Sequence, residues 1–113
     1  MMSELYAAST PELQARRREL APEQLGAFHE FSRKVFAEGA LSARVKQLIA
    51  VAVAHTTQCP YCIRGHTEGA VKAGASDEEI MEAIWVAAEM RAGAAYAHST
   101  IALDTLEKVR ASR

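Results

Sequence analysis

Residues 59–66, Cys-Pro-Tyr-Cys-Ile-Arg-Gly-His, hold both cysteines of the chain and a histidine four positions after the second. Pro60 suits the first turn of a helix, which places Cys59 at or next to the N-terminal cap. On such a helix Cys62 and His66 are four residues apart and face the same side. Free N–H groups and the positive end of the helix dipole then lie beside the sulfurs and favour the thiolate.

A Cys-X-X-Cys pair is typical of a redox site, in which one thiolate attacks and the other resolves the adduct as a disulfide. Two alternatives stay open: the cysteines are small apolar core residues, or they bind zinc together with two histidines. The four ligands of that zinc site would be His55, Cys59, Cys62 and His66. They lie in a nearly straight stripe along the helices, which does not match the tetrahedral coordination of zinc. Covalent haem attachment is excluded, because Ile63 stands where it requires a histidine.

Upstream of this motif the pattern predicts three helices. Pro11 opens a short one that ends near Leu20, and Pro22 starts an amphipathic one that Gly39 ends. Ser42 caps the third. Its apolar stripe consists of Val45, Leu48, Ile49, Ala52 and Val53.

Downstream, the cysteine helix is predicted to continue to Gly74. Ser76 and Glu79 then form a capping box that starts another helix. Gly93 predicts a break or kink, followed by a last helix from residue 94 to about 110.

The fold class is therefore all-α: a compact helical subunit with a central helix-turn-helix that carries the cysteine pair. Residues 1–20 are expected to form an N-terminal arm or short helix, and residues 21–113 one helical domain. No period-two alternation and no internal repeat are present.

The composition narrows the function. Thirteen basic and fourteen acidic residues leave a net charge of −1, which argues against a nucleic-acid partner. The longest apolar run, residues 48–54, is too short to span a membrane, and the acidic N-terminus predicts no signal peptide. We expect a cytoplasmic protein, in which a Cys-X-X-Cys pair is more often catalytic or metal-binding than a structural disulfide.

With the motif placed on a helix-turn-helix, a family resemblance becomes visible. Residues 43–54 (ARVKQLIAVAVA), the cysteine motif with His66, and residues 73–80 (AGASDEEI) resemble the alkylhydroperoxidase D-like (AhpD-like) branch of the carboxymuconolactone decarboxylase superfamily. The resemblance covers about residues 23–108. It implies an all-helical subunit that forms trimers or hexamers and uses its cysteines to reduce peroxides or to pass electrons between disulfides.

The resemblance also implies residue roles: Cys62 attacks, Cys59 resolves, and His66 moves protons. The position of the family's relay glutamate falls on Gln47, whose amide cannot accept a proton. Either the relay is broken, or another acid, such as Glu68 or Glu89, reaches the site from elsewhere in the fold or from a neighbouring subunit. His55 is a second candidate base.

We therefore expect a thiol-dependent peroxidase or disulfide oxidoreductase with an antioxidant role and no cofactor, weakened by Gln47. Its substrate is a peroxide or a disulfide, and a lipoyl group or a thioredoxin-like protein returns it to the dithiol. One alternative is a decarboxylase-like lyase on a small organic acid, with His66 as acid–base and a carboxylate held by Arg44, Arg64 or Arg91. The other is a non-enzymatic redox or metal-binding protein.

A homo-oligomer, trimer or hexamer, is also expected. Residues 48–53 and 80–88 are apolar on more than one side, and a helix of that kind must be buried on most of its faces. A chain of 113 residues has few layers with which to cover them. Neighbouring copies are the natural cover.

Overall fold

The computed structural model of the chain describes residues 5–113. Over this range the elements are α2 (Pro11–Leu20), α3 (Pro22–Phe36), α4 (Ala43–Thr57), α5 (Pro60–Lys72) and α6 (Asp77–Ala111), and no strand is found there. The all-α prediction is confirmed. The first four residues of the predicted N-terminal arm lie outside the described residues.

The predicted helix starts are confirmed by their caps. The Ser42 hydroxyl accepts a hydrogen bond from the Val45 backbone N–H (3.1 Å) at the start of α4. At the start of α6 the Ser76 hydroxyl accepts from the Glu79 N–H (3.1 Å), and the Glu79 carboxylate accepts from the Ser76 N–H (2.9 Å). This reciprocal pair satisfies two N–H groups that a helix start otherwise leaves without partners.

Helices α4, α5 and α6 form the body of the molecule, and α4 packs against both of the others. The core lies where the three meet: Val51 of α4, Ala70 of α5 and Ile80 of α6 are buried against one another. Two tight connections bring the helices together. Gln58, with φ of 55°, turns the chain between α4 and α5, and Gly74, with φ of +93°, turns it between α5 and α6.

The prediction of a break at Gly93 is wrong, because α6 is one continuous helix of 35 residues. A glycine inside a helix costs about 1 kcal/mol relative to alanine. Here alanines at positions 92, 94 and 95 flank it, and alanine is the strongest helix former, so the helix continues through the glycine. The prediction that Gly39 ends α3 is also off by three residues, since that helix ends at Phe36.

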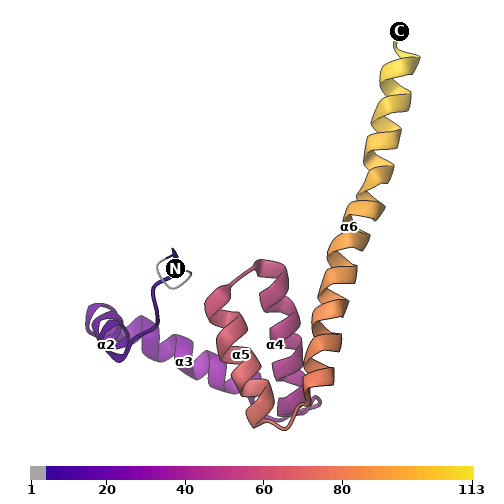
Figure 1. Cartoon of the computed structure of the whole chain (residues 1–113). Helices are drawn as coiled ribbons and strands as arrows, with labels where there is room; N and C mark the ends of the chain where they lie inside the picture. The colour runs from indigo at the N-terminus through magenta and orange to yellow at the C-terminus, as the bar shows by residue number, and fades with distance from the viewer. Residues whose placement is uncertain (1–4) are drawn as a thin grey trace.

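The prediction of a compact subunit is wrong for the single chain. The principal extents are 62 × 34 × 34 Å, and the radius of gyration is 19.8 Å, whereas a compact chain of about 100 residues has a radius near 13 Å. Figure 1 shows why: the C-terminal half of α6 projects away from the body, and α2 and α3 lie on the other side of it. The core is rich in alanine and buries too little apolar area to hold these elements against the body.

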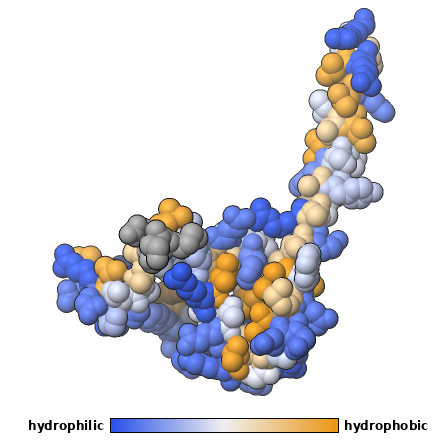
Figure 2. All heavy atoms as spheres, in the orientation of Figure 1, coloured by the Kyte–Doolittle hydropathy of each residue, from blue (hydrophilic) through white to orange (hydrophobic). Residues whose placement is uncertain are grey.

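Many apolar side chains consequently lie on the surface. Trp85 on α6 is 69% exposed, and Ile49 and Val53 on α4 are 47% and 52% exposed. Figure 2 shows apolar side chains both over the helical body and along the projecting part of α6. Of the described helices, none combines the length and the hydrophobicity needed to cross a membrane.

Candidate dithiol site

The cysteine motif begins α5 as the sequence predicts. Cys59 is the N-cap residue and Pro60 stands in the first turn. The Cys59 sulfur accepts a hydrogen bond from the Cys62 backbone N–H, with an N···S distance of 3.2 Å. Both cysteines are free thiols and both are half-buried. The helix start therefore directs an N–H donor at the first sulfur, where a negative charge is favoured.

The two thiols differ in acidity. The Cys62 thiol donates a hydrogen bond to the Cys59 sulfur, and this bond, together with the Cys62 backbone N–H, lowers the pKa of Cys59 below its usual value. The same bond raises the pKa of Cys62, and partial burial raises it further. In the reduced pair the thiolate is thus favoured at Cys59, whereas the family resemblance assigns the attack to Cys62.

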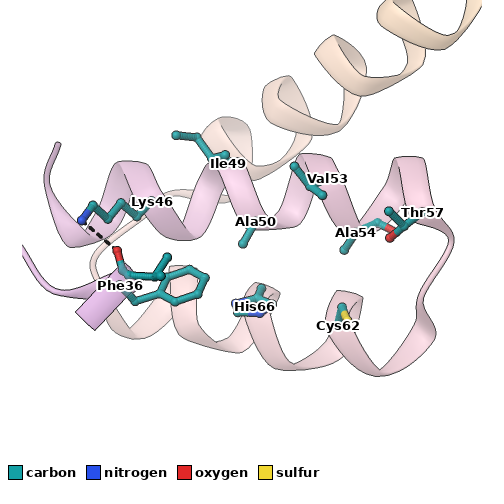
Figure 3. A pocket seen from close by; sticks show the side chains of 10 residues that line it. Phe36, Lys46, Ile49, Ala50, Val53, Ala54, Thr57, Cys62 and His66 are labelled. Carbon is teal, nitrogen blue, oxygen red and sulfur yellow. Dashed lines mark hydrogen bonds between the residues drawn. The ribbon is translucent and has the colours of Figure 1, made fainter. Parts of the chain in front are cut away.

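A cavity of about 410 Å³ opens between α4, α5 and the end of α3. Figure 3 shows the Cys62 and His66 side chains pointing from α5 into the gap that faces α4. The remaining lining is mainly apolar. It consists of Val35, Phe36, Lys46, Ile49, Ala50, Val53, Ala54 and Thr57. Cys62 lines this cavity and Cys59 does not, so a small molecule in it meets the second thiol.

His66 is held from two sides. Its Nδ1 lies 2.9 Å from the Oε1 atom of Gln47, so the position matched to the family's relay glutamate does contact the histidine. The Phe36 ring stacks on the imidazole, with centroids 5.0 Å apart and planes 20° apart. An amide oxygen only accepts hydrogen bonds, so Nδ1 carries the proton and Nε2 is left as the proton acceptor.

Lys46 fixes the end of α3 beside this site. Its Nζ donates to the carbonyl oxygens of Val35 (2.8 Å) and Ala37 (2.6 Å), which α3 leaves without helical partners. The dashed line from Lys46 in Figure 3 marks one of these bonds. Sequence reasoning missed Phe36 and Lys46 as site residues, because only the packing of α3 against α4 and α5 brings them to His66.

The other proposed bases and acids are not at the cavity. The Nδ1 of His55 donates to the Val51 carbonyl oxygen (2.7 Å) one turn back on α4. Glu68 is exposed and pairs with Lys72 at 3.1 Å. Glu68 lines a different cavity, between α2 and α5, and neither it nor Glu89 lines the cavity of Cys62.

The four proposed zinc ligands do not come together either. Within residues 5–113, no three His, Cys, Asp or Glu side chains are grouped closely enough to hold a metal ion. The geometry therefore gives no support to the metal-binding alternative.

The fold and the site together define an all-α protein with a candidate dithiol site. The cysteine pair stands at the start of a helix, and a histidine follows one turn later. Residues 22–105 match the model of the carboxymuconolactone decarboxylase family. The chain belongs to this family, which contains both peroxidases and decarboxylases.

The chain is also similar to individual proteins and solved structures, one of which carries the same family name. The chain is 66% identical over 83 residues to "Uncharacterized protein 4 in cox locus" of Paracoccus denitrificans, covering 74% of this chain and 75% of that protein. A crystal structure from Methanobacterium thermoautotrophicum is 40% identical and has a TM-score of 0.69, over 74% of this chain and 93% of the other. A carboxymuconolactone decarboxylase family protein from Legionella pneumophila is 33% identical with a TM-score of 0.68, over 86% and 87%.

Proposed function

We propose that the protein is a thiol-dependent peroxidase or disulfide oxidoreductase of the AhpD-like branch of its family. One observation carries the proposal: Cys62 and His66 line the same apolar cavity one helical turn apart, and Cys59 is the N-cap residue of that helix. A nucleophile, a proton acceptor and a resolving thiol are the groups that a two-cysteine peroxidase requires.

The reaction takes three balanced steps. The Cys62 sulfur attacks the distal oxygen of a hydroperoxide, forming Cys62 sulfenic acid and releasing an alcohol. His66 holds the thiol proton and returns it to the departing alkoxide. The Cys59 thiolate then attacks the sulfur of the sulfenic acid: the S–S bond forms, the S–O bond breaks, and the departing hydroxide takes a proton from solvent and leaves as water. An external dithiol, a lipoyl group or a thioredoxin-like protein, reduces this disulfide by exchange and is itself oxidised.

The lower pKa of Cys59 is consistent with its proposed role as the resolving thiol. A Cys59 thiolate, stabilised by its N-cap position, is ready to resolve the sulfenic acid as soon as that acid forms. Cys62 is the less acidic thiol and needs a base when peroxide arrives, a role that the Nε2 atom of His66 supplies. The apolar lining of the cavity favours an organic hydroperoxide over hydrogen peroxide.

The decarboxylase-like alternative is less well supported, because none of the three candidate arginines lines the cavity. Arg44 pairs with Glu79, Arg91 donates to the Thr56 carbonyl oxygen (3.1 Å), and Arg64 lines the cavity between α2 and α5. Among the described residues that line the cavity, Lys46 is the one cation, and its amine already donates to two backbone carbonyls. A carboxylate substrate would have to compete for it.

The test is consumption of cumene hydroperoxide and of hydrogen peroxide with dihydrolipoamide as reductant. The wild type should turn over, and faster with the organic peroxide, whereas Cys62→Ser should be inactive. Cys59→Ser should react once and stop as a sulfenic acid, which dimedone labels. If the wild type consumes neither peroxide and exchanges no disulfide with a lipoyl or thioredoxin-like partner, the proposed function is wrong.

We further propose that the protein works as a homo-oligomer, trimer or hexamer. The support is the exposed apolar surface of α6, where Trp85, Tyr96 and Leu103 are 69%, 82% and 60% exposed, and of Ile49 and Val53 at the cavity. A second copy laid over these residues buries them and narrows the cavity mouth. Light scattering at micromolar concentration tests this, since a mass near 12.3 kDa contradicts it.

A further inference from the structure

Gly69 lies three residues after His66 on α5 and so shares its face of the helix. A Cβ atom added at this position would lie 2.7 Å from the Oε1 atom of Gln47, 2.9 Å from its Cδ and 3.2 Å from its Nε2. All three nearest atoms belong to that one side chain. The space left by the absent Cβ is therefore filled by the Gln47 amide, the group that contacts His66.

The other glycine of the helix interior shows no such contact. At Gly65 an added Cβ would meet nothing within 4 Å. Gly69 also has no need of glycine's backbone freedom, because it stands inside α5 and has no positive φ. Glycine in a helix interior is unfavourable relative to alanine. What distinguishes position 69 is thus the Gln47 side chain that crosses it.

The Gln47 amide controls which nitrogen of His66 carries the proton. Its Oε1 atom accepts from Nδ1 at 2.9 Å, which keeps the proton on Nδ1 and leaves Nε2 as the base. When Nε2 takes the thiol proton, the Nδ1–H bond remains and supports the imidazolium. Because an amide cannot take that proton onward, it stays available for the departing alkoxide. The charged or titratable groups that share the cavity with His66 are Cys62 and Lys46.

We propose that Gly69 is a positioning residue for His66: by having no side chain it leaves a slot for the Gln47 amide, which holds the imidazole in the tautomer with Nδ1 protonated. This deepens the proposed function, because it assumes that His66 is the proton acceptor. It assigns no contact between Gly69 and the substrate.

Gly69→Ala is the direct test, with Gly65→Ala as the matched control on the same helix. The first readout is the long-range ¹H–¹⁵N correlation spectrum of His66 at a pH where the ring is neutral. The wild type and Gly65→Ala should show Nδ1 protonated, whereas Gly69→Ala should show a mixture with the Nε2–H tautomer that free histidine prefers. The second readout is the rate at which peroxide oxidises Cys62, which should fall about tenfold in Gly69→Ala only, part of the contribution of a well-placed base.

Gln47→Ala completes the test without adding an atom at position 69, so it serves even if Gly69→Ala folds poorly. By itself Gln47→Ala should also give a mixture of the two His66 tautomers. On the Gln47→Ala background, Gly69→Ala should change the tautomer mixture no further. The inference is overturned if the His66 spectrum of either single variant matches the wild type, or if Gly69→Ala changes it equally with and without Gln47. If the tautomer responds as expected but no variant, nor the wild type, reacts with peroxide, the proposed function fails and the positioning role stands.

Discussion

Replacing Phe36 by alanine removes one of the contacts that hold the end of α3 beside the dithiol site. Phe36 is half-buried, its ring stacks on His66, and it lines the cavity that contains Cys62. A fully buried phenylalanine costs about 3–5 kcal/mol when cut to alanine, so a half-buried one is expected to cost about 2 kcal/mol. Loss of the ring stacking is included in that figure and accounts for about 0.5–1.5 kcal/mol of it.

The matched control is Phe31→Ala on the same helix. Phe31 is 64% exposed and its nearest aromatic partner is Phe28, with centroids 6.5 Å apart. Its removal should cost less than about 1 kcal/mol, since substitutions at exposed positions have small effects. Urea unfolding followed by circular dichroism, at one protein concentration for all variants, measures both free energies of unfolding.

A second assay examines the site itself. In a Cys59→Ser background, which keeps a good N-cap residue, iodoacetamide reports only on Cys62. Phe36→Ala opens one wall of the cavity and should speed alkylation, whereas Phe31→Ala should not. The reasoning is refuted if the two phenylalanine variants lose equal stability, or if the alkylation rate of Cys62 is the same in both.

Three further predictions concern the pKa values and the helix caps. The Cys62 thiol lowers the pKa of Cys59 by hydrogen bonding, so Cys62→Ala should raise that pKa and slow alkylation of Cys59 at neutral pH; unchanged kinetics would show that the bond is absent. The Ser76 N–H and then Arg44 lower the pKa of Glu79, so its contribution to stability is complete above the usual carboxyl pKa and is lost as the pH falls through the lowered one. Glu79→Gln should therefore flatten the acid side of the stability profile, and a profile identical to the wild type would contradict this. Ser76→Ala removes the other half of the capping box and should cost about 1 kcal/mol, measured by thermal unfolding against Ser112→Ala, whose hydroxyl only donates to the Val109 carbonyl oxygen at the far end of α6.

The sequence alone determined the helices and the position of the dithiol. Prolines, capping residues and apolar spacing act over three or four residues, so the starts of α4, α5 and α6 follow from short segments. The placing of Cys59 at the cap of α5 is of the same kind, because it depends only on Pro60 and the residues after it. The role of each cysteine in the reaction stays a prediction.

The tertiary structure decided what surrounds the dithiol. Gln47 reaches His66 from α4, and Phe36 reaches it from α3. Contacts of this kind join residues 19 and 30 positions apart, and no local pattern records them. The same holds for Gly69, because its close approach to the Gln47 side chain exists only when α4 packs against α5.

The length of α6 also required the structure. A glycine in a helix is a small local penalty, and the alanines beside Gly93 outweigh it. The overall shape could not be read from composition for a related reason. The apolar residues of a sequence indicate that a surface favours burial. Whether the chain itself buries that surface or leaves it exposed, as at Trp85, depends on where the helices lie. The sequence specifies which groups must be buried, and only packing in three dimensions specifies against what.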